Sequence, residues 1–165
     1  PENKMIKDFS SGMKMKLKIA TAISHKPQIL ILDEPTSGLD PIVRNEILDI
    51  FRQFIAEDET RSILVSTHIT TDLEHISDYI MFIKNGEITL NLPTSEILEN
   101  YGIVKCDKKD FSKISKEDYE YYRKEKYQYE VLVKNKKMIK SKYGISTIDK
   151  ASIEDIMLFY IKGEK

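Results

Sequence analysis

Two adjacent carboxylates, Asp33 and Glu34, follow directly after the short apolar run 28–32. A run of this kind predicts a strand, and parallel sheets bind their ligands beyond the C-terminal ends of their strands. The first carboxylate can hold a hydrated Mg²⁺ ion, which neutralises phosphate charge. The second can orient and deprotonate a water molecule for attack on phosphorus. The pair therefore predicts phosphoryl-transfer chemistry, with Asp33 as metal ligand and Glu34 as general base.

A second candidate feature lies nearer the N-terminus, at Ser10, Ser11 and Gly12. The apolar residues that follow recur at helical spacing between lysines, which predicts an amphipathic helix that ends before Pro27. A hydroxyl group and free backbone N–H groups at the start of a helix form a site for an anion. The segment is therefore a candidate phosphate-binding site.

The elements that must position these residues alternate between helix and strand. Asp40 is expected to cap a helix that has Pro41 at its first position. Residues 62–66 form a second apolar, β-branched run, which predicts a strand, and His68 lies just beyond its end. A β-hairpin is expected over residues 79–92. Short apolar strands separated by helices predict an α/β fold whose parallel sheet is covered on both faces.

The composition changes near residues 100–102. Residues 1–100 carry 10 basic and 16 acidic side chains, whereas residues 101–165 carry 16 basic and 11 acidic ones. A shift of this size predicts a domain boundary at that point. We expect the second region to be a small, basic, tyrosine-rich α+β appendage, with a helical stretch near 116–126 and a closing helix over 152–161.

The carboxylate pair lies within the run ILILDEPTSGLD, residues 29–40. This run resembles the Walker B motif, catalytic glutamate and D-loop of the ATP-binding cassette (ABC) ATPase family. The resemblance assigns Asp33 to the metal, Glu34 to catalysis and Asp40 to the D-loop, beside the bound nucleotide. The run is long and its spacing is fixed, so it is a specific signal.

Two other segments extend the resemblance to about residues 5–92. Residues 9–13, FSSGM, are similar to the family signature, commonly LSGGQ, and keep Ser10 and Gly12, which would face phosphate. His68 resembles the switch histidine, which contacts the γ-phosphate of ATP. The order of signature, Walker B motif, D-loop and switch is the order found in the family.

The resemblance implies a partial P-loop NTPase (RecA-like) ABC core with a mostly parallel sheet. It also implies ATP and Mg²⁺ as cofactors, a second nucleotide-binding subunit that closes over ATP, and a membrane permease as partner. A protein of this kind is expected in the cytoplasm, peripheral on the inner face of the cell membrane. The FSSGMKMKL pattern is similar to a branch of bacterial exporter ATPases.

The sequence departs from the family pattern in several places. Ser11 stands where a glycine is usual, and Met13 stands where a glutamine is usual. None of the six glycines lies in a G-x-x-x-x-G-K-[ST] loop, so the 165 residues contain no Walker A motif. We interpret the chain as the C-terminal portion of a nucleotide-binding subunit, inactive without the half that carries Walker A.

The composition excludes several other classes of protein. The formal net charge of −1 argues against a strongly basic nucleic-acid binder. The longest stretch without Asp, Glu, Lys or Arg has ten residues, 62–71, whereas a bilayer-spanning helix needs about 20 predominantly apolar ones. The single cysteine, Cys106, cannot form an internal disulfide and is interpreted as a spectator thiol. These features predict a soluble protein.

Two other functions remain open on the sequence alone. One is a soluble ABC ATPase of the DNA-repair or translation class, although the coiled-coil, zinc or paired-cassette insertions usual there are absent from these residues. The other is a non-catalytic interaction module, in which the basic region 101–165 is the working part and the cassette segment is scaffold.

Overall fold

The structure, a computed structural model, describes residues 5–165, so residues 1–4 of the expected first domain lie outside the described range. The chain divides into two compact units, Pro1–Asp72 and Leu73–Lys165. This division falls before the change in composition near residue 100. A nucleotide-binding domain that extends to residue 100 therefore stays a prediction.

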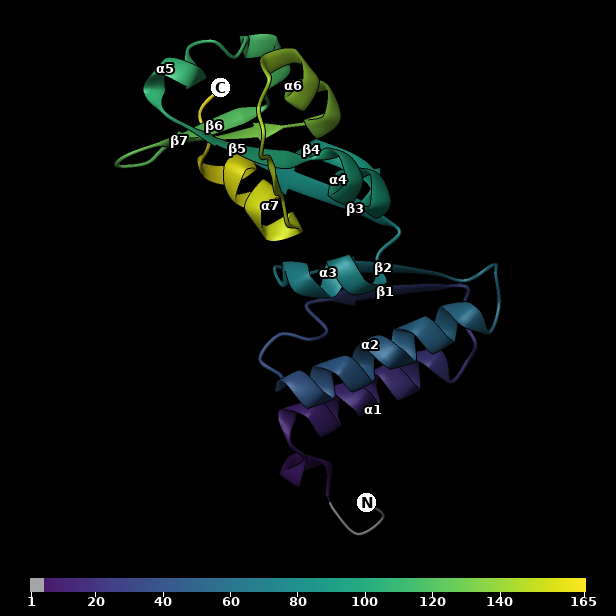
Figure 1. The fold of residues 1–165 in the computed structure, drawn as a ribbon. Coiled ribbons are helices and arrows are strands. Elements are labelled where there is room, and N and C mark those ends of the chain that lie inside the picture. The colour runs from purple at the N-terminus through teal and green to yellow at the C-terminus, as the bar shows by residue number, and fades with distance from the viewer. Residues whose placement is uncertain (1–4) are drawn as a thin grey trace. The chain divides into compact units, whose positions relative to one another are not determined.

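The first unit is a two-stranded parallel sheet with helices. Its elements are η1 (Ile6–Asp8), α1 (Ser11–Ile23), β1 (Ile29–Asp33), α2 (Pro41–Ala56), β2 (Ser62–Ser66) and the first residues of α3 (Thr70–Ile76). β1 pairs with β2 in parallel, in a register that runs from Ile29 beside Ser62 to Asp33 beside Ser66. Helices α1 and α2 run side by side on one face of this strand pair (Figure 1). The α/β prediction is confirmed.

Helices α1 and α2 each begin directly after a residue whose side chain caps the helix. The side chain of Ser10 accepts a hydrogen bond of 3.2 Å from the backbone N–H of Met13, which caps α1. Asp40 caps α2, because one carboxylate oxygen accepts from two backbone N–H groups, those of Ile42 and Val43, at 3.1 and 3.0 Å. Pro41 occupies the first position of α2, where its missing N–H is not needed.

The strand pair is covered on one face only. Leu30 is 5% exposed, and the inner faces of the helices bury Ile19, Ile47, Leu48, Phe51 and Phe54. On the other face of the strands Ile31 is 72% exposed and Leu64, its cross-strand neighbour, is 62% exposed. The expectation of a sheet covered on both faces is therefore wrong for the described residues of the first unit, because α1 and α2 both lie on the opposite face.

The second unit is an α+β fold. Its elements after α3 are β3 (Tyr79–Lys84), β4 (Glu87–Pro93), α4 (Thr94–Asn100), β5 (Gly102–Cys106), α5 (Lys108–Phe111), η2 (Lys116–Asp118), β6 (Tyr121–Lys124), β7 (Tyr129–Val133), α6 (Lys136–Tyr143), β8 (Asp149–Lys150) and α7 (Ile153–Lys162). β3 and β4 form an antiparallel hairpin, and the other strands form an antiparallel sheet of order β6-β7-β5-β8. Asn85 and Gly86 have φ values of 54° and 80°, as a tight hairpin turn between twisted strands requires.

The prediction of a helix near residues 116–126 is wrong. The segment forms the short 3₁₀ turn η2 followed by strand β6, which pairs with β7. Tyr121 packs against one hydrophobic cluster and Tyr122 against another, so neighbouring side chains point to opposite faces of the sheet. The two-residue alternation of a strand therefore overrides the helical preference of the charged residues.

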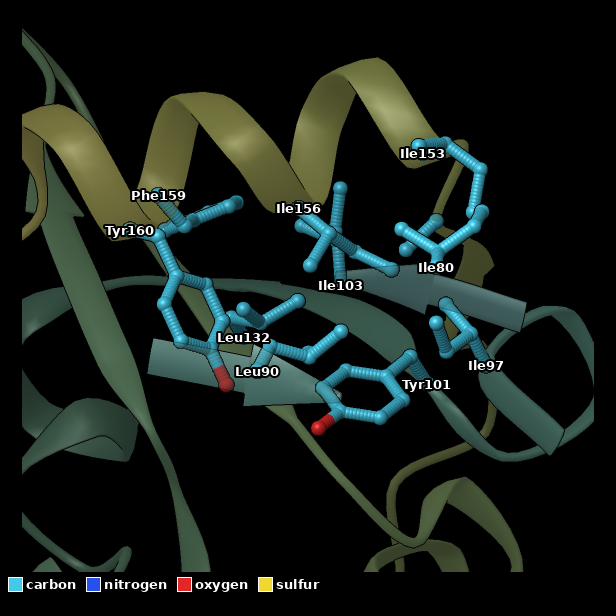
Figure 2. Close-up of a cluster of buried hydrophobic side chains, with 11 residues drawn as sticks. Ile80, Leu90, Ile97, Tyr101, Ile103, Leu132, Ile153, Ile156, Phe159 and Tyr160 are labelled. Atoms are coloured by element: carbon cyan, nitrogen blue, oxygen red, sulfur yellow. The ribbon is translucent and has the colours of Figure 1, made fainter. Parts of the chain in front are cut away.

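Successive side chains of the central strands β5 and β7 point to opposite faces of the sheet. They therefore contribute to two hydrophobic cores, one on each face. Figure 2 shows α7 directing Ile153, Ile156 and Phe159 toward Ile103 and Leu132 of the sheet, beside residues of β3, β4 and α4. The opposite face packs with α6 and the segment around α5 through a second cluster, Val104, Ile114, Tyr119, Val131, Val133 and Ile139. The segment β3–α4 thus shares a core with the region beyond residue 100.

The helices of residues 5–165 are short, and the longest, α2, has 16 residues. Nowhere in this range does a helix combine the length and the apolar character needed to cross a bilayer.

Candidate functional site

The predicted carboxylates lie at the C-terminal ends of β1 and β2. Asp33 ends β1 and is paired in register with Ser66, the last residue of β2. The hydroxyl group of Ser66 donates a hydrogen bond to a carboxylate oxygen of Asp33. Asp33 therefore presents an exposed carboxylate, anchored by the neighbouring strand, at the edge where parallel sheets bind ligands.

Glu34 turns the chain out of the sheet and toward the next loop. Its backbone N–H still donates to the carbonyl of Ser66 at 2.9 Å, while its φ of 47° places the residue in the left-handed region that a non-glycine residue seldom adopts. Strain of this kind gathers at functional sites, where the surrounding structure maintains it.

The carboxylate of Glu34 binds the loop that carries His68. One carboxylate oxygen accepts from the backbone N–H of His68 at 3.1 Å and lies 2.7 Å from Nδ1 of the same residue. Thr67 donates to the other oxygen at 3.4 Å. An ionised carboxylate can only accept, so a hydrogen bond at this position requires that Nδ1 carry the proton. The side chains of His68 and Glu34 are 69% and 36% exposed, so both reach solvent.

The helix starts form a second group of candidate residues. Ser10 is exposed and its side chain caps α1, while Ser11 is the exposed first residue of that helix. Gly12 is buried, and a Cβ atom there would lie 2.7 Å from Cγ1 of Val43 in the first turn of α2. Gly12 therefore allows the two helix starts to approach closely, and Asp40, which caps α2, belongs to the same corner of the unit.

The structure thus brings Asp33, Glu34 and His68 together at the strand ends. It groups Ser10, Ser11 and Gly12 with Asp40 at the neighbouring helix starts. Sequence reasoning missed Ser66, although its position at the end of the second strand was the signal that could have found it. Nothing in the local pattern pointed to the steric role of Gly12.

The donor set suits a cation that shares its ligands with a phosphate group. No group of three or more His, Cys, Asp or Glu side chains among residues 5–165 could hold a metal ion by itself. Asp33 offers one carboxylate, beside the hydroxyl of Ser66. Mg²⁺ usually takes one or two carboxylates together with phosphate oxygens and waters, so these residues fit a Mg²⁺–nucleotide complex.

The part of the chain that carries these motifs is similar to known proteins. The family model described as "AAA domain, putative AbiEii toxin, Type IV TA system" matches residues 6–71. The lantibiotic transport ATP-binding protein SrtF of Streptococcus pyogenes is 45% identical over 89 residues, which are 54% of this chain and 38% of that protein. The bacitracin transport ATP-binding protein BcrA of Enterococcus faecalis is 40% identical over 96 residues, 58% of this chain and 31% of that protein.

The chain therefore spans only about a third of the length of these two curated relatives. A solved dimeric ATP-binding cassette in a post-hydrolysis state, bound to ADP and Pi, matches with a TM-score of 0.50 and 24% identity. That match covers 56% of this chain and 39% of the cassette. This likeness shows that the matched part of the chain has the fold of the corresponding part of that cassette. The site residues thus lie in a chain whose homologues are ATP-binding proteins of ABC transporters, and they include proteins of lantibiotic and bacitracin transport.

Proposed function

We propose that this chain is part of the ATP-binding and ATP-hydrolysing subunit of an ABC transporter, which energises transport through a separate membrane permease. The observation that carries the proposal is the arrangement of Asp33, Glu34 and His68 at the C-terminal ends of two parallel strands. The sequence likeness to transport ATP-binding proteins supports the same assignment.

Glu34 acts as the general base in this proposal. Its side chain is 36% exposed, so its carboxylate is accessible to water, and the residue directly follows the end of β1. His68 holds one carboxylate oxygen through two N–H groups, which fixes the orientation of Glu34. A base placed in this way accepts the proton of an attacking water at a defined position.

Asp33 would hold Mg²⁺, with Ser66 fixing its carboxylate. When bound, Mg²⁺–ATP supplies the phosphoryl group and the charge that neutralises it. Ser10, Ser11 and Gly12 would present the N-terminus of α1 to the γ-phosphate of ATP held by a second nucleotide-binding subunit. Free N–H groups and the helix dipole favour a negative charge at that point.

The whole protein would work on the inner face of the cell membrane, bound to its permease. The 165 residues contain no Walker A motif and match only part of their relatives, which supports the view that they are one portion of a longer subunit. We expect this portion alone not to turn over ATP, because Walker A supplies most of the contacts to phosphate.

The variant Glu34→Gln in the complete subunit tests the proposal. It keeps the size of the side chain and removes the base, so the turnover number should fall by about 10²–10⁴-fold while ATP still binds. Glu59→Gln, at an exposed position in the turn after α2, is the matched control and should hydrolyse ATP normally. Steady-state ATPase assays and nucleotide binding on both variants measure this. Normal turnover by Glu34→Gln would refute the assignment.

A further inference from the structure

A buried hydrogen bond joins the loop that carries Glu34 to the first turn of α3, the helix that follows the His68 loop. The hydroxyl of Thr36 donates to a carboxylate oxygen of Asp72 at 2.7 Å. Thr36 is 2% exposed and Asp72 is 4% exposed, so solvent does not compete for the bond. Thr36 lies two residues after Glu34, and Asp72 lies four residues after His68.

Each of these loops is closed by its own turn hydrogen bonds. The backbone N–H of Ser37 donates to the carbonyl of Glu34, and the N–H of Leu39 donates to the carbonyl of Thr36. After His68, the N–H of Asp72 in the first turn of α3 donates to the carbonyl of Ile69. These local bonds shape each loop but do not set the distance between them.

Besides the long bond of 3.4 Å from Thr67 to Glu34, two side-chain links connect the Glu34 loop with the segment after β2. The link between His68 and Glu34 is exposed, so water competes for it. The link between Thr36 and Asp72 is buried, and breaking it would leave a carboxylate without its donor in a dry environment. The buried link is therefore the one that can hold the loop spacing while the exposed link forms and opens.

We propose that Thr36 and Asp72 are positioning residues, which hold the two loops at the separation that lets His68 bind and orient Glu34. Neither side chain would touch the nucleotide. The inference rests on the proposed function only where turnover is concerned, because the contact between His68 and Glu34 can be observed without any reaction.

The test measures the ¹⁵N and proton chemical shifts of the His68 imidazole by nuclear magnetic resonance, in the 165-residue chain labelled with ¹⁵N-histidine. A hydrogen-bonded, protonated Nδ1 gives ¹⁵N and proton shifts distinct from those of a free ring, and the exposed His25 and His75 serve as references. Thr36→Val removes the hydroxyl and keeps the shape of the side chain. We expect it to move the His68 signal toward the values of the two exposed rings, whereas Thr36→Ser keeps the original signal.

A matched control separates positioning from general loss of stability. Thr94 is also buried, at 6% exposure, and its hydroxyl lies 3.0 Å from that of Ser77 in the second unit. Thr94→Val should lower the melting temperature as Thr36→Val does, yet leave the His68 signal unchanged. An unchanged His68 signal in a folded Thr36→Val chain would overturn the proposal.

Asp72→Ala removes the bond from the other side if Thr36→Val fails to fold. This variant leaves only a hydroxyl without its partner, which costs less than a buried carboxylate without its donor. The His68 signal should move as in Thr36→Val, and an unchanged signal would again overturn the proposal. In the complete subunit, Thr36→Val should lower the turnover number by roughly tenfold to a hundredfold with little change in KM. If no version of the subunit hydrolyses ATP, the proposed function fails, while the resonance result still decides the positioning role.

Discussion

At the scale of single residues, Ser10 combines a structural role with a proposed functional one. Its side chain caps α1, and the same helix start is the proposed site for the γ-phosphate. Replacing Ser10 by alanine would therefore confuse loss of the cap with loss of binding. Asp and Asn are both good N-cap residues and differ mainly in charge, so they separate the two roles.

We predict that Ser10→Asp abolishes ATP-dependent dimerisation of the complete subunit, whereas Ser10→Asn retains most of it. Two like charges about 4 Å apart repel by roughly 4 kcal/mol near a protein surface, which is about a thousandfold in affinity. Sedimentation with ATP, in a Glu34→Gln background that cannot hydrolyse it, measures the effect. Equal dimerisation by the two variants would show that the start of α1 is not part of the phosphate site.

Cys106 is the single thiol of the chain and lies half-buried at the end of β5. Burial raises the pKa of its thiol, and the nearby carboxylates of Asp110 and Asp107 raise it further. A raised pKa lowers the fraction of reactive thiolate at any given pH below it.

Alkylation of Cys106 should therefore be slower in the folded chain than in the chain unfolded in urea. The midpoint of its pH–rate profile should also lie above that of the unfolded chain. Reaction with iodoacetamide across a pH series, followed by mass spectrometry, measures both quantities. Faster reaction in the folded state would show an activated thiol instead of a spectator.

At the scale of elements, the close approach of α1 and α2 depends on the missing side chain of Gly12. Alanine normally stabilises the interior of a helix relative to glycine by roughly 0.5–1 kcal/mol. Here a Cβ atom would lie 2.7 Å from Cγ1 of Val43, well inside contact distance. Whether Gly12→Ala raises or lowers the free energy of unfolding therefore shows whether the two helices are in close contact.

We predict that Gly12→Ala lowers the free energy of unfolding by about 1–3 kcal/mol, as overpacking does. Val43→Ala, which opens space, should make the same substitution neutral or stabilising. Urea unfolding of the four members of this double-mutant cycle gives the coupling between the two positions. Stabilisation by Gly12→Ala alone would mean that the helices do not approach closely.

This contact also changes how the phosphate site is best tested. A charged side chain at Gly12 would collide with α2 before it met any phosphate group. Substitutions of Ser10, which is exposed, avoid the collision.

At the scale of the whole molecule, the uncovered faces of the strand pairs are the main source of exposed apolar surface. Ile29, Ile31 and Leu64 are 64%, 72% and 62% exposed on one face of β1 and β2. The hairpin of β3 and β4 likewise exposes Tyr79, Met81, Ile83 and Ile88. Contiguous apolar surface of this kind favours association between copies of a chain.

We predict that the 165-residue chain self-associates and that Ile31→Lys combined with Leu64→Glu reduces this association. The two positions are cross-strand neighbours, so the new charges can pair with little loss of stability. Ile42→Lys combined with Ile55→Glu, at exposed positions of α2, is the matched control and should associate like the unchanged chain. Sedimentation velocity over a range of concentrations compares the three chains. A wild-type chain that stays monomeric would contradict the prediction.

Local chemistry explains what the sequence by itself determined. Ser10 and Asp40 cap the helices that follow them, because capping joins a side chain to backbone groups only two or three residues away. Asn85-Gly86 forms its hairpin for the same reason, since a tight turn depends on the φ values of its own residues. The position of Asp33 and Glu34 at a strand end likewise followed from the apolar run before them.

Only the tertiary structure decided how distant residues meet. Glu34 meets His68, and Thr36 meets Asp72, because β1 and β2 pair in a register that no local pattern specifies. The segment 116–126 illustrates the opposite case, where pairing with β7 overrides a local preference for helix. Side chains separated by more than thirty positions come together only once strands pair and cores pack, so their contacts depend on the fold as a whole.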